Sequence, residues 1–383
     1  MTDLVVISLE VWDEVWRRNQ HLVAGLLRAG YVDRVLFVEP AVDVLHSLRH
    51  RRRPERPGLR QVHLEGVAGE VWALRPVKSL PRRIDRGGDL RRARAIARTA
   101  RRLGMKSPAL WVNDPGGVEV LELTGWPALY DITDDWLVAD RPAAELDRLR
   151  RQEGKLFAEC REVVVCSEGL RRSKSGQREV VLIPNAVDLE PYRSLQARPA
   201  DLPSGPVALY LGTAHRDRVD VELCLATARR LAERGSRPDG AGSVVLVGPA
   251  PLPLADLAAL RDADVLVLGP RPREQVPGYL QHADVLLVPH VLTEFTASLD
   301  PIKAYEYRAA RRPIVSTPVP GFVDAEDPLV AAVSADEFPD AVARAVAAPV
   351  TWTRGLPDDT PTWGLRVEQM ATVIERVAGG SRA

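Results

Sequence analysis

The 383-residue sequence contains only three cysteines, Cys160, Cys166 and Cys224, and none forms a Cys-x-x-Cys pair. This scarcity argues against a disulfide framework or a zinc knuckle and fits a reducing cytosol. No apolar run approaches the roughly 18 residues that a membrane-spanning helix needs. The N-terminus enters a predicted strand at once, without the basic and apolar segments of a secretion signal. We therefore expect a cytoplasmic protein.

The sequence has no net charge, but one segment has a large excess of basic residues. The 52 basic and 52 acidic residues balance, yet residues 46–106 contain 18 Lys and Arg against 5 Asp and Glu. One interpretation is a set of solvated helices; the other is a surface that attracts anionic lipid head groups or an acidic acceptor. Little aromatic interleaving occurs in this stretch, which argues against a nucleic-acid groove. Peripheral contact with the inner membrane face through residues 46–106 remains open.

Short apolar, β-rich runs alternate with stretches of helical periodicity along the whole chain. The runs are 4–8, 35–38, 71–74, 109–112, 128–130, 163–166 and 181–183, then 207–211, 244–247, 265–268, 285–288 and 314–316. Helical periodicity is clearest over 16–28, 82–103, 221–234 and 363–377. This alternation predicts parallel sheets with right-handed crossovers.

A linker rich in Pro, Ala, Ser and Gly, residues 191–206, separates the two series of strands. The sequence therefore predicts an α/β fold of two Rossmann-like domains, 1–195 and 196–360, with a final helix in 361–383 that packs back on the first domain. Four strands of the second domain end at Gly or Pro. Such turns at the carboxyl edge of a parallel sheet are where α/β domains bind ligands, and we expect a cleft between the two carboxyl edges.

The segment 294–317 is the most informative one. Pro301 suits the first turn of a helix, because the N–H it lacks has no partner there. The amides of Ile302 and Lys303 would then point outward at a positive helix end, which favours a diphosphate. Asp300 is a candidate N-cap.

Lys303 and Glu306 are three residues apart and share one face of this predicted helix. A carboxylate there can accept both hydroxyls of a ribose, and an ammonium can neutralise phosphate charge. The alternative is a surface Lys–Glu pair worth a few tenths of a kcal/mol.

The segment resembles the donor-site signature of the large retaining glycosyltransferase family 4, which has the GT-B fold. Glu306 matches the second glutamate of that signature, and residues 309–316 match its "A-A-G-x-P-V-V-S". Ser298 stands at the first glutamate position and Arg311 at the usual glycine, in a version with a "P-x-K-x-x-E-Y" core. The resemblance implies that Glu306 binds the nucleotide ribose and that Pro301–Lys303 hold the diphosphate. Glu294, Ser298 or Asp300 would contact the sugar.

Further elements match in order and spacing. Residues 182–188 resemble "I-P-N-G-V-D", Gly212 and Thr213 end a "Y-x-G" strand, and Gly248 ends a "V-G" strand. In the resembled family the first of these motifs ends the first domain, and the resemblance implies donor contacts at Gly212, Thr213 and Gly248. It also implies contacts by Arg271, near the nucleotide base, and by Arg216 and Arg218, on the phosphates.

The first domain is less diagnostic. Trp12 and Arg18 lie between the first strand and the first helix, and their interpretation as acceptor or phosphate contacts stands beside that of a helix start with a packed Trp. Asp114, Asp131 and Asp134 follow later strands and are candidates for a general base or for orienting the acceptor, and equally for caps and turns. Asp131, Asp134 and Asp135 could ligate a metal in isolation, but the resemblance implies that a metal is dispensable.

The resemblance implies transfer of a sugar from a nucleoside diphosphate sugar to an acceptor hydroxyl or amine, with retention and without a cofactor. A cell-envelope glycan or a specialised metabolite would be the acceptor. The alternatives are a GT-B sugar-nucleotide epimerase or pseudo-glycosyltransferase, and a non-catalytic nucleotide-sugar-binding protein.

Overall fold

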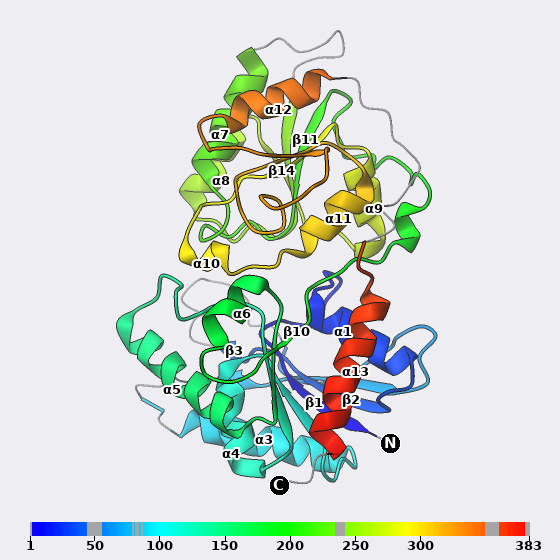
Figure 1. The fold of residues 1–383 in the computed structure, drawn as a ribbon, viewed down its shortest axis with the longest axis vertical. Helices are drawn as coiled ribbons and strands as arrows, with labels where there is room; N and C mark the ends of the chain where they lie inside the picture. Colours follow the sequence, from blue (N-terminus) through cyan, green and yellow to red (C-terminus); the bar gives the residue numbers. More distant parts are fainter. Residues whose placement is uncertain are drawn as a thin grey trace. The chain divides into compact units, whose positions relative to one another are not determined.

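The computed structural model describes residues 2–43, 56–78, 80, 84–85, 87–233, 242–348 and 360–379. The chain forms two compact units (Figure 1): unit 1 is Met1–Pro184 with Trp363–Ala383, and unit 2 is Asn185–Thr362. The structural division after Pro184 precedes the boundary at 195 that the sequence suggested. The boundary falls earlier because Val187 already packs in the unit 2 core. The Val187 N–H also donates to the Pro361 carbonyl of the same unit (3.2 Å).

Unit 1 is built on an eight-stranded sheet in the order β10-β9-β8-β7-β1-β2-β5-β4. Its strands are β1 (Asp3–Ile7), β2 (Arg34–Val38), β4 (Gly58–Val62), β5 (Glu70–Arg75), β7 (Ala109–Val112), β8 (Ala128–Ile132), β9 (Glu162–Val165) and β10 (Val181–Leu182). All neighbours pair in parallel except β4, which runs antiparallel to β5. The prediction of parallel sheets is confirmed, and β4, which the sequence analysis did not predict, adds one antiparallel strand at this edge. Strand β4 has exposed residues and lacks the apolar run that marks the buried strands.

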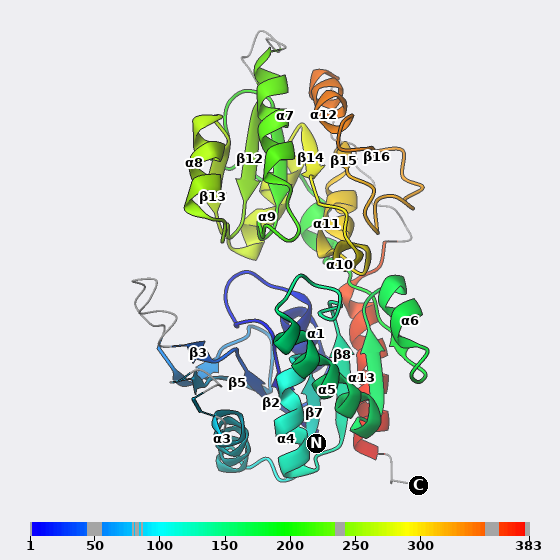
Figure 2. The ribbon, with the colours of Figure 1, turned by 90° about the vertical axis from the view of Figure 1, so that its left-hand side faces the viewer.

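Helices cover both faces of this sheet (Figure 2). They are α1 (Arg18–Arg28), α3 (Gly88–Arg102), α4 (Val118–Thr124), α5 (Ala143–Glu159), α6 (Glu168–Lys174) and α13 (Trp363–Gly379), together with the short 3-10 helix η1 (Pro115–Gly117). Strands β3 (Val42–Asp43) and β6 (Val77–Lys78) form a separate two-stranded sheet. The C-terminal helix α13 packs beside α1, where Val367 meets Gly25. The helix predicted over 82–103 begins at Gly88, and residues 82, 83 and 86 lie outside the described residues.

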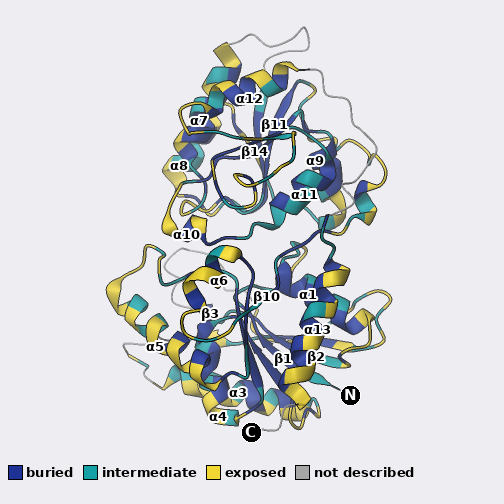
Figure 3. Cartoon of the chain, viewed as in Figure 1, coloured by how far each residue is buried: buried dark blue, intermediate teal, exposed yellow. Residues whose placement is uncertain are grey.

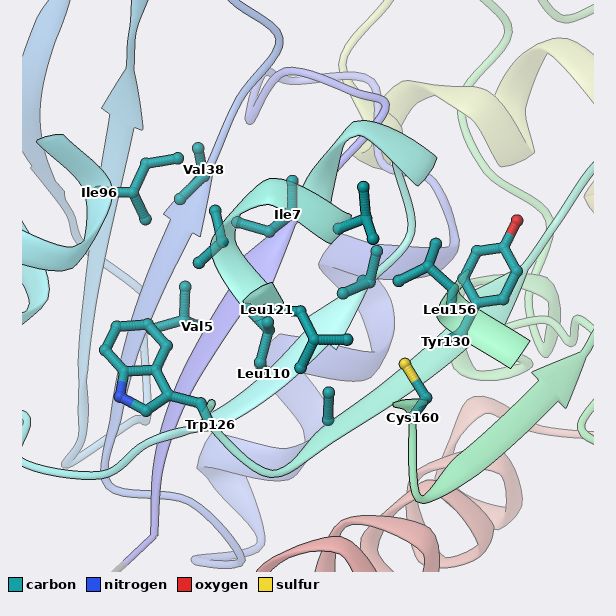
Figure 4. Close-up of a cluster of buried hydrophobic side chains, with 14 of the residues drawn as sticks. Val5, Ile7, Val38, Ile96, Leu110, Leu121, Trp126, Tyr130, Leu156 and Cys160 are labelled. Carbon is teal, nitrogen blue, oxygen red and sulfur yellow. The ribbon is translucent and has the colours of Figure 1, made fainter. Parts of the chain in front are cut away.

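The unit 1 core lies between the sheet and helices α3, α4 and α5 (Figure 4). Val5 and Leu110 from the central strands pack with Ile96 of α3, Leu121 of α4 and Leu156 of α5. Removing such a side chain by substitution with alanine costs about 2–5 kcal/mol of stability. The core therefore holds the carboxyl ends of the strands in fixed positions.

Unit 2 has a six-stranded parallel sheet in the order β13-β12-β11-β14-β15-β16. The strands are β11 (Val207–Leu211), β12 (Ser243–Val247), β13 (Leu266–Gly269), β14 (Val285–Val288), β15 (Ile314–Ser316) and β16 (Val330–Ala332). The helices are α7 (Val221–Glu233), α8 (Leu254–Asp262), α9 (Val276–Gln281), α10 (Glu294–Ala297), α11 (Ile302–Ala310) and α12 (Phe338–Ala347), with η2 (Glu190–Tyr192) and η3 (Arg273–Gln275). Figure 3 shows buried strands and helices exposed on their outer faces.

Both sheets have the doubly wound strand order, in which the chain leaves a central pair of strands in opposite directions. The central pair is β1 and β7 in unit 1 and β11 and β14 in unit 2. Among the described helices, none is long and apolar enough to cross a membrane.

Candidate functional site

The carboxyl ends of the central strands β11 and β14 form the switch point of unit 2, where such folds bind ligands. Gly212 follows β11 with φ of 133°, and Gly248 follows β12 with φ of 134°. A Cβ on Gly248 would lie 2.3 Å from the Gly212 carbonyl oxygen, so the strand ends approach too closely for a side chain. The two glycines thus leave bare backbone at this edge.

Helix α11 begins beside these strand ends and is not capped by a side chain. Its N-cap is Pro301, and the helix starts at Ile302. The prediction that Asp300 caps this helix is wrong. Its Oδ2 accepts the Asn185 N–H (2.5 Å), and its Oδ1 accepts the Tyr305 hydroxyl (2.9 Å). Asp300 therefore braces the helix start, and the first amides of α11 keep the positive end that favours an anion.

Lys303 projects from the first turn of α11 toward the end of β11. Its Nζ lies 3.8 Å from the centroid of the Tyr210 ring and 3.3 Å from His290 Nε2. A Cβ on Gly212 would stand 3.1 Å from the same Nζ, so the glycine makes room for the ammonium. We call Lys303, Tyr210 and His290 the lysine cluster.

Among the described residues, no carboxylate forms an ion pair with the Lys303 side chain of the lysine cluster. Burial holds the pKa of Lys303 well below its ordinary value, and Arg218 lowers it further, while Glu306 opposes the shift. Burial, Lys303 and Arg218 hold the pKa of His290 well below 6.5. His290 is therefore neutral near pH 7 and can accept a hydrogen bond from the Lys303 ammonium. An anion placed here would favour the charged form of Lys303.

Glu306 lies one turn further along α11. Burial raises the pKa of its carboxyl to about 7, against the opposing effect of Lys303. Within the part of the chain that the structure describes, its carboxylate has no hydrogen bond or ion pair. Lys303 and Glu306 therefore do not form the surface ion pair that was the alternative interpretation. A half-buried carboxylate with open acceptor positions is suited to a ligand that donates hydrogen bonds.

Tyr307 fixes α11 against both central strands. The Leu211 N–H donates to the Tyr307 hydroxyl (2.8 Å), which in turn donates to the Leu287 carbonyl (3.3 Å). The helix start, Lys303 and Glu306 are consequently held in register with the strand ends.

The other predicted donor residues divide into two groups. Arg218 is half-buried, with its guanidinium 5.3 Å from the Phe295 ring, and is close enough to influence Lys303. Thr213 follows Gly212, and its carbonyl accepts the Tyr210 hydroxyl (3.1 Å). These two residues border the lysine cluster.

The second group consists of predicted donor residues that have other contacts in unit 2 or are exposed. Arg216 is 70% exposed at its side chain and lies 3.5 Å from Asp256. Arg271 donates to the Tyr279 hydroxyl (2.8 Å) and pairs with Asp201 in the linker. The buried Ser298 hydroxyl donates to the Phe295 carbonyl (2.7 Å), and Glu294 is exposed at the start of α10.

In unit 1, the structure neutralises the predicted catalytic carboxylate Asp131. Asp131 is fully buried, pairs with Arg18 (Nε to Oδ2, 3.3 Å) and accepts the Trp111 indole N–H (3.1 Å). Arg18 is itself buried and donates to the Pro184 carbonyl (3.4 Å). Interpreting Arg18 as a ligand contact and Asp131 as a general base therefore needs correction, because each satisfies the other inside the fold.

The remaining unit 1 candidates also have structural partners. Trp12 is 8% exposed and packs edge-to-face on Phe37 at 4.9 Å, so the packed-Trp interpretation holds rather than an acceptor contact. Asp114 accepts the Gly116 N–H (2.8 Å) as the cap of η1. Asp134 is half-buried and lies 3.3 Å from the Thr133 hydroxyl. In the ranges that the structure covers, no group of three or more His, Cys, Asp or Glu side chains is arranged to hold a metal ion.

His290, which lies 3.3 Å from the Lys303 ammonium nitrogen, was not among the candidate donor residues that the sequence indicated. The signal available was its position two residues beyond the apolar run 285–288, at the carboxyl end of a strand. Its backbone is fixed by Thr317, whose hydroxyl accepts the His290 N–H (3.2 Å) and donates to the His290 carbonyl (2.8 Å). Only the folded chain places that ring against Lys303.

Known proteins resemble this chain both in part of its sequence and in its fold. Residues 205–348 match the family model Glycosyl transferases group 1. TuaH of Bacillus subtilis (strain 168), proposed to be a teichuronic acid biosynthesis glycosyltransferase, is 23% identical over 238 residues. That match covers 58% of this chain and 58% of TuaH. Unit 2 therefore contains a group 1 glycosyltransferase domain.

Solved structures show the fold of the whole chain. An E. coli trehalose-6-phosphate structure bound with UDP-2-fluoro glucose superposes with a TM-score of 0.61 at 14% identity, covering 98% of this chain and 96% of that one. A trehalose-6-phosphate synthase, studied with bisubstrate glycomimetics for glycosyl transfer with retention, gives a TM-score of 0.59 at 14% identity, covering 97% and 95%. The chain has the GT-B fold, with two Rossmann-like domains.

Proposed function

We propose that this protein transfers a glycosyl group from a nucleoside diphosphate sugar to an acceptor hydroxyl or amine, with retention of configuration. The observation that carries the proposal is that α11 places an uncapped helix start, Lys303 and Glu306 next to one another. The uncapped helix start and Lys303 suit a diphosphate, and the unpartnered Glu306 suits the vicinal hydroxyls of a ribose.

Donor binding would compensate the electrostatic cost of this site. The diphosphate would lie against the amides of Ile302 and Lys303, with the Lys303 ammonium restored by the negative charge. Glu306 would accept two hydroxyl hydrogen bonds as a carboxylate, and each such bond to a charged group is worth about 1.5–3 kcal/mol. Arg218 would add a second cation near the phosphates.

The same groups would act in the chemical step. The leaving diphosphate gains negative charge as the glycosidic bond to it breaks, and the helix start and Lys303 would stabilise that charge where it develops. The acceptor oxygen or nitrogen would bond to the anomeric carbon on the face from which the diphosphate departs, and its proton would pass to the leaving phosphate. Bond formation and departure on the same face give retention. The GT-B neighbour studied for transfer with retention supports this stereochemistry.

The acceptor class is proposed from the relative rather than from the site. TuaH is linked to teichuronic acid, a cell-envelope polymer, and this favours an envelope glycan over a specialised metabolite. We propose that neither a metal nor another cofactor is needed, since helix amides and cations would serve the phosphates.

The proposal is tested by binding and product analysis. Thermal-shift measurements with UDP, GDP and TDP and their sugars should identify one nucleotide that raises Tm by mass action. Glu306→Gln should lose most of that shift and lower kcat/KM by about a hundredfold, as expected for lost charged hydrogen bonds. Glu222→Gln, an exposed glutamate on α7, is the matched control.

The alternatives give different outcomes. An isomerised or rearranged donor in place of a new glycoside would indicate an epimerase or a pseudo-glycosyltransferase. Nucleotide binding without turnover across many acceptors would indicate a binding protein. Undiminished nucleotide binding by Glu306→Gln would contradict the assigned site.

A further inference from the structure

The outer face of α3 in unit 1 carries a row of basic side chains. Arg94, Arg98, Arg101 and Arg102 are exposed, and Lys106 follows the helix end. At 100° per residue the four arginines fall within about 100° of the helix circumference. The opposite face carries the buried Ala93, Ile96, Ala97 and Ala100. We call the exposed row, with Lys106, the arginine stripe.

The arginine stripe makes no ion pair with the described residues of unit 1. Within the described residues, none of its five cations has a carboxylate oxygen within ion-pairing distance. The neighbouring arginines of the same helix differ, since Arg91 pairs with Asp85 and Arg92 with Asp89. At about 1.5 Å per residue of helix, the four arginines from Arg94 to Arg102 therefore present positive charge along roughly 12 Å of α3.

Apolar side chains are exposed next to this charge. Ile84 is 71% exposed and Leu90 is 37% exposed, at the amino end of α3. The turn at Asp85 is held against that end, because the Gly88 N–H donates to the Asp85 carbonyl (3.3 Å) and Asp85 pairs with Arg91.

We infer that the arginine stripe docks unit 1 on a bilayer of anionic phospholipids, with Ile84 and Leu90 entering the interface. The basic row complements lipid phosphates, and exposed aliphatic side chains beside it suit the head-group boundary. A nucleic-acid partner would instead use aromatic side chains for stacking, and the stripe has none. The inference goes beyond the proposed glycosyl transfer and does not depend on it.

The test is co-sedimentation of the full chain with vesicles. Binding is expected to vesicles that contain phosphatidylglycerol, and not to pure phosphatidylcholine, and it should weaken as salt screens the charges. The triple variant Arg94→Glu, Arg98→Glu, Arg101→Glu should lower the partition coefficient by more than about tenfold. Ile84→Ser should lower it by a few-fold without altering its salt dependence.

A matched control separates the stripe from net charge. The triple variant Arg151→Glu, Arg229→Glu, Arg261→Glu makes the same charge change at exposed arginines elsewhere and should retain binding. The milder Arg94→Gln, Arg98→Gln, Arg101→Gln variant serves if the charge reversal impairs folding. Equal loss in the stripe and control variants, equal binding to neutral vesicles, or preference for a DNA duplex over vesicles would overturn the inference. Nucleotide-induced Tm shifts of the stripe variant, which concern unit 2, report separately on the proposed function.

Discussion

The switch points of the two sheets share a strand order but differ in how their polar groups are satisfied. In unit 1, Asn19 Nδ2 donates to the Ser8 hydroxyl (3.2 Å) and to Asn113 Oδ1 (3.0 Å), beside the buried Arg18–Asp131 pair. In unit 2, Lys303 faces a neutral imidazole, and the Glu306 carboxylate makes no hydrogen bond or ion pair with the described residues. Both edges are polar, but among the described residues the charged groups Arg18 and Asp131 pair with each other, whereas Lys303 and Glu306 do not.

This difference separates charges that hold the fold from charges that serve a ligand. Unit 1 also buries Lys174 between Asp135 (2.9 Å) and Glu153 (2.8 Å). Such an arrangement tolerates burial because each charge has a partner, and loss of one partner leaves the others exposed to the low dielectric. Substitution in unit 1 should therefore reduce stability, whereas substitution in the donor site of unit 2 should reduce ligand binding.

The largest expected effect is in unit 1. Lys174→Met leaves two buried carboxylates without their cation and should destabilise the protein by about 3–5 kcal/mol. The measurement is chemical denaturation followed by circular dichroism. Lys155→Met, which breaks an exposed pair with Glu122, is the control and should leave the midpoint unchanged. Equal denaturation midpoints for the two variants would contradict the claim that the buried charges of unit 1 stabilise the fold.

The next effect concerns pH and Glu306. The folded pKa of about 7 exceeds the ordinary value of 4.5, so the folded state binds this proton more tightly than the unfolded state. The stabilisation is present below pH 4.5 and is lost as pH rises through 7. Ligand-free wild type should thus lose on the order of 2 kcal/mol relative to Glu306→Gln between pH 4.5 and 8. Parallel curves of stability against pH for the two proteins would show that burial does not raise the pKa of Glu306.

A smaller effect is expected at His290, which we regard as positioning Lys303. His290→Phe removes the acceptor for the ammonium and should raise the donor KM about tenfold, or about 1.4 kcal/mol, with less change in kcat. His290→Asn retains a side-chain acceptor and should recover part of the loss. His282→Phe removes an imidazole that contacts the Gln196 carbonyl, away from Lys303, and should leave the donor KM unaltered. Additive losses in His290→Phe and Lys303→Met combined would speak against coupling.

The smallest effect tests the end of α11. Arg311 adopts a left-handed conformation, φ 56° and ψ 45°, at the position where the resembled family has glycine. Arg311→Gly should be more stable than Arg311→Ala by about 1 kcal/mol, because both lose the contact with Asp327 and only glycine relieves the backbone. Thermal unfolding of the two variants decides this. Greater stability of the alanine variant would show that the left-handed turn does not form.

Much of unit 2 could be predicted from sequence because its signals are local. Apolar runs ending in glycine mark the strands, and Pro301 followed by Lys303 and Glu306 marks a helix start with two charges on one face. The carboxylates of unit 1 were predicted less well. Asp131 and Asp114 follow strands just as catalytic groups do, and no local signal shows that Arg18, 113 residues away in sequence, neutralises Asp131.

The sequence by itself determined the strand and helix order, the glycines at the strand ends and the positions of Lys303 and Glu306, since these depend on backbone preferences and residue spacing along a short segment. Only the tertiary structure decided which charges have partners. It brought His290 to Lys303, gave Asp300 to Asn185 and Tyr305, and buried Asp131 against Arg18. Ion pairing and burial depend on distances between residues far apart in the chain, and folding alone sets those distances.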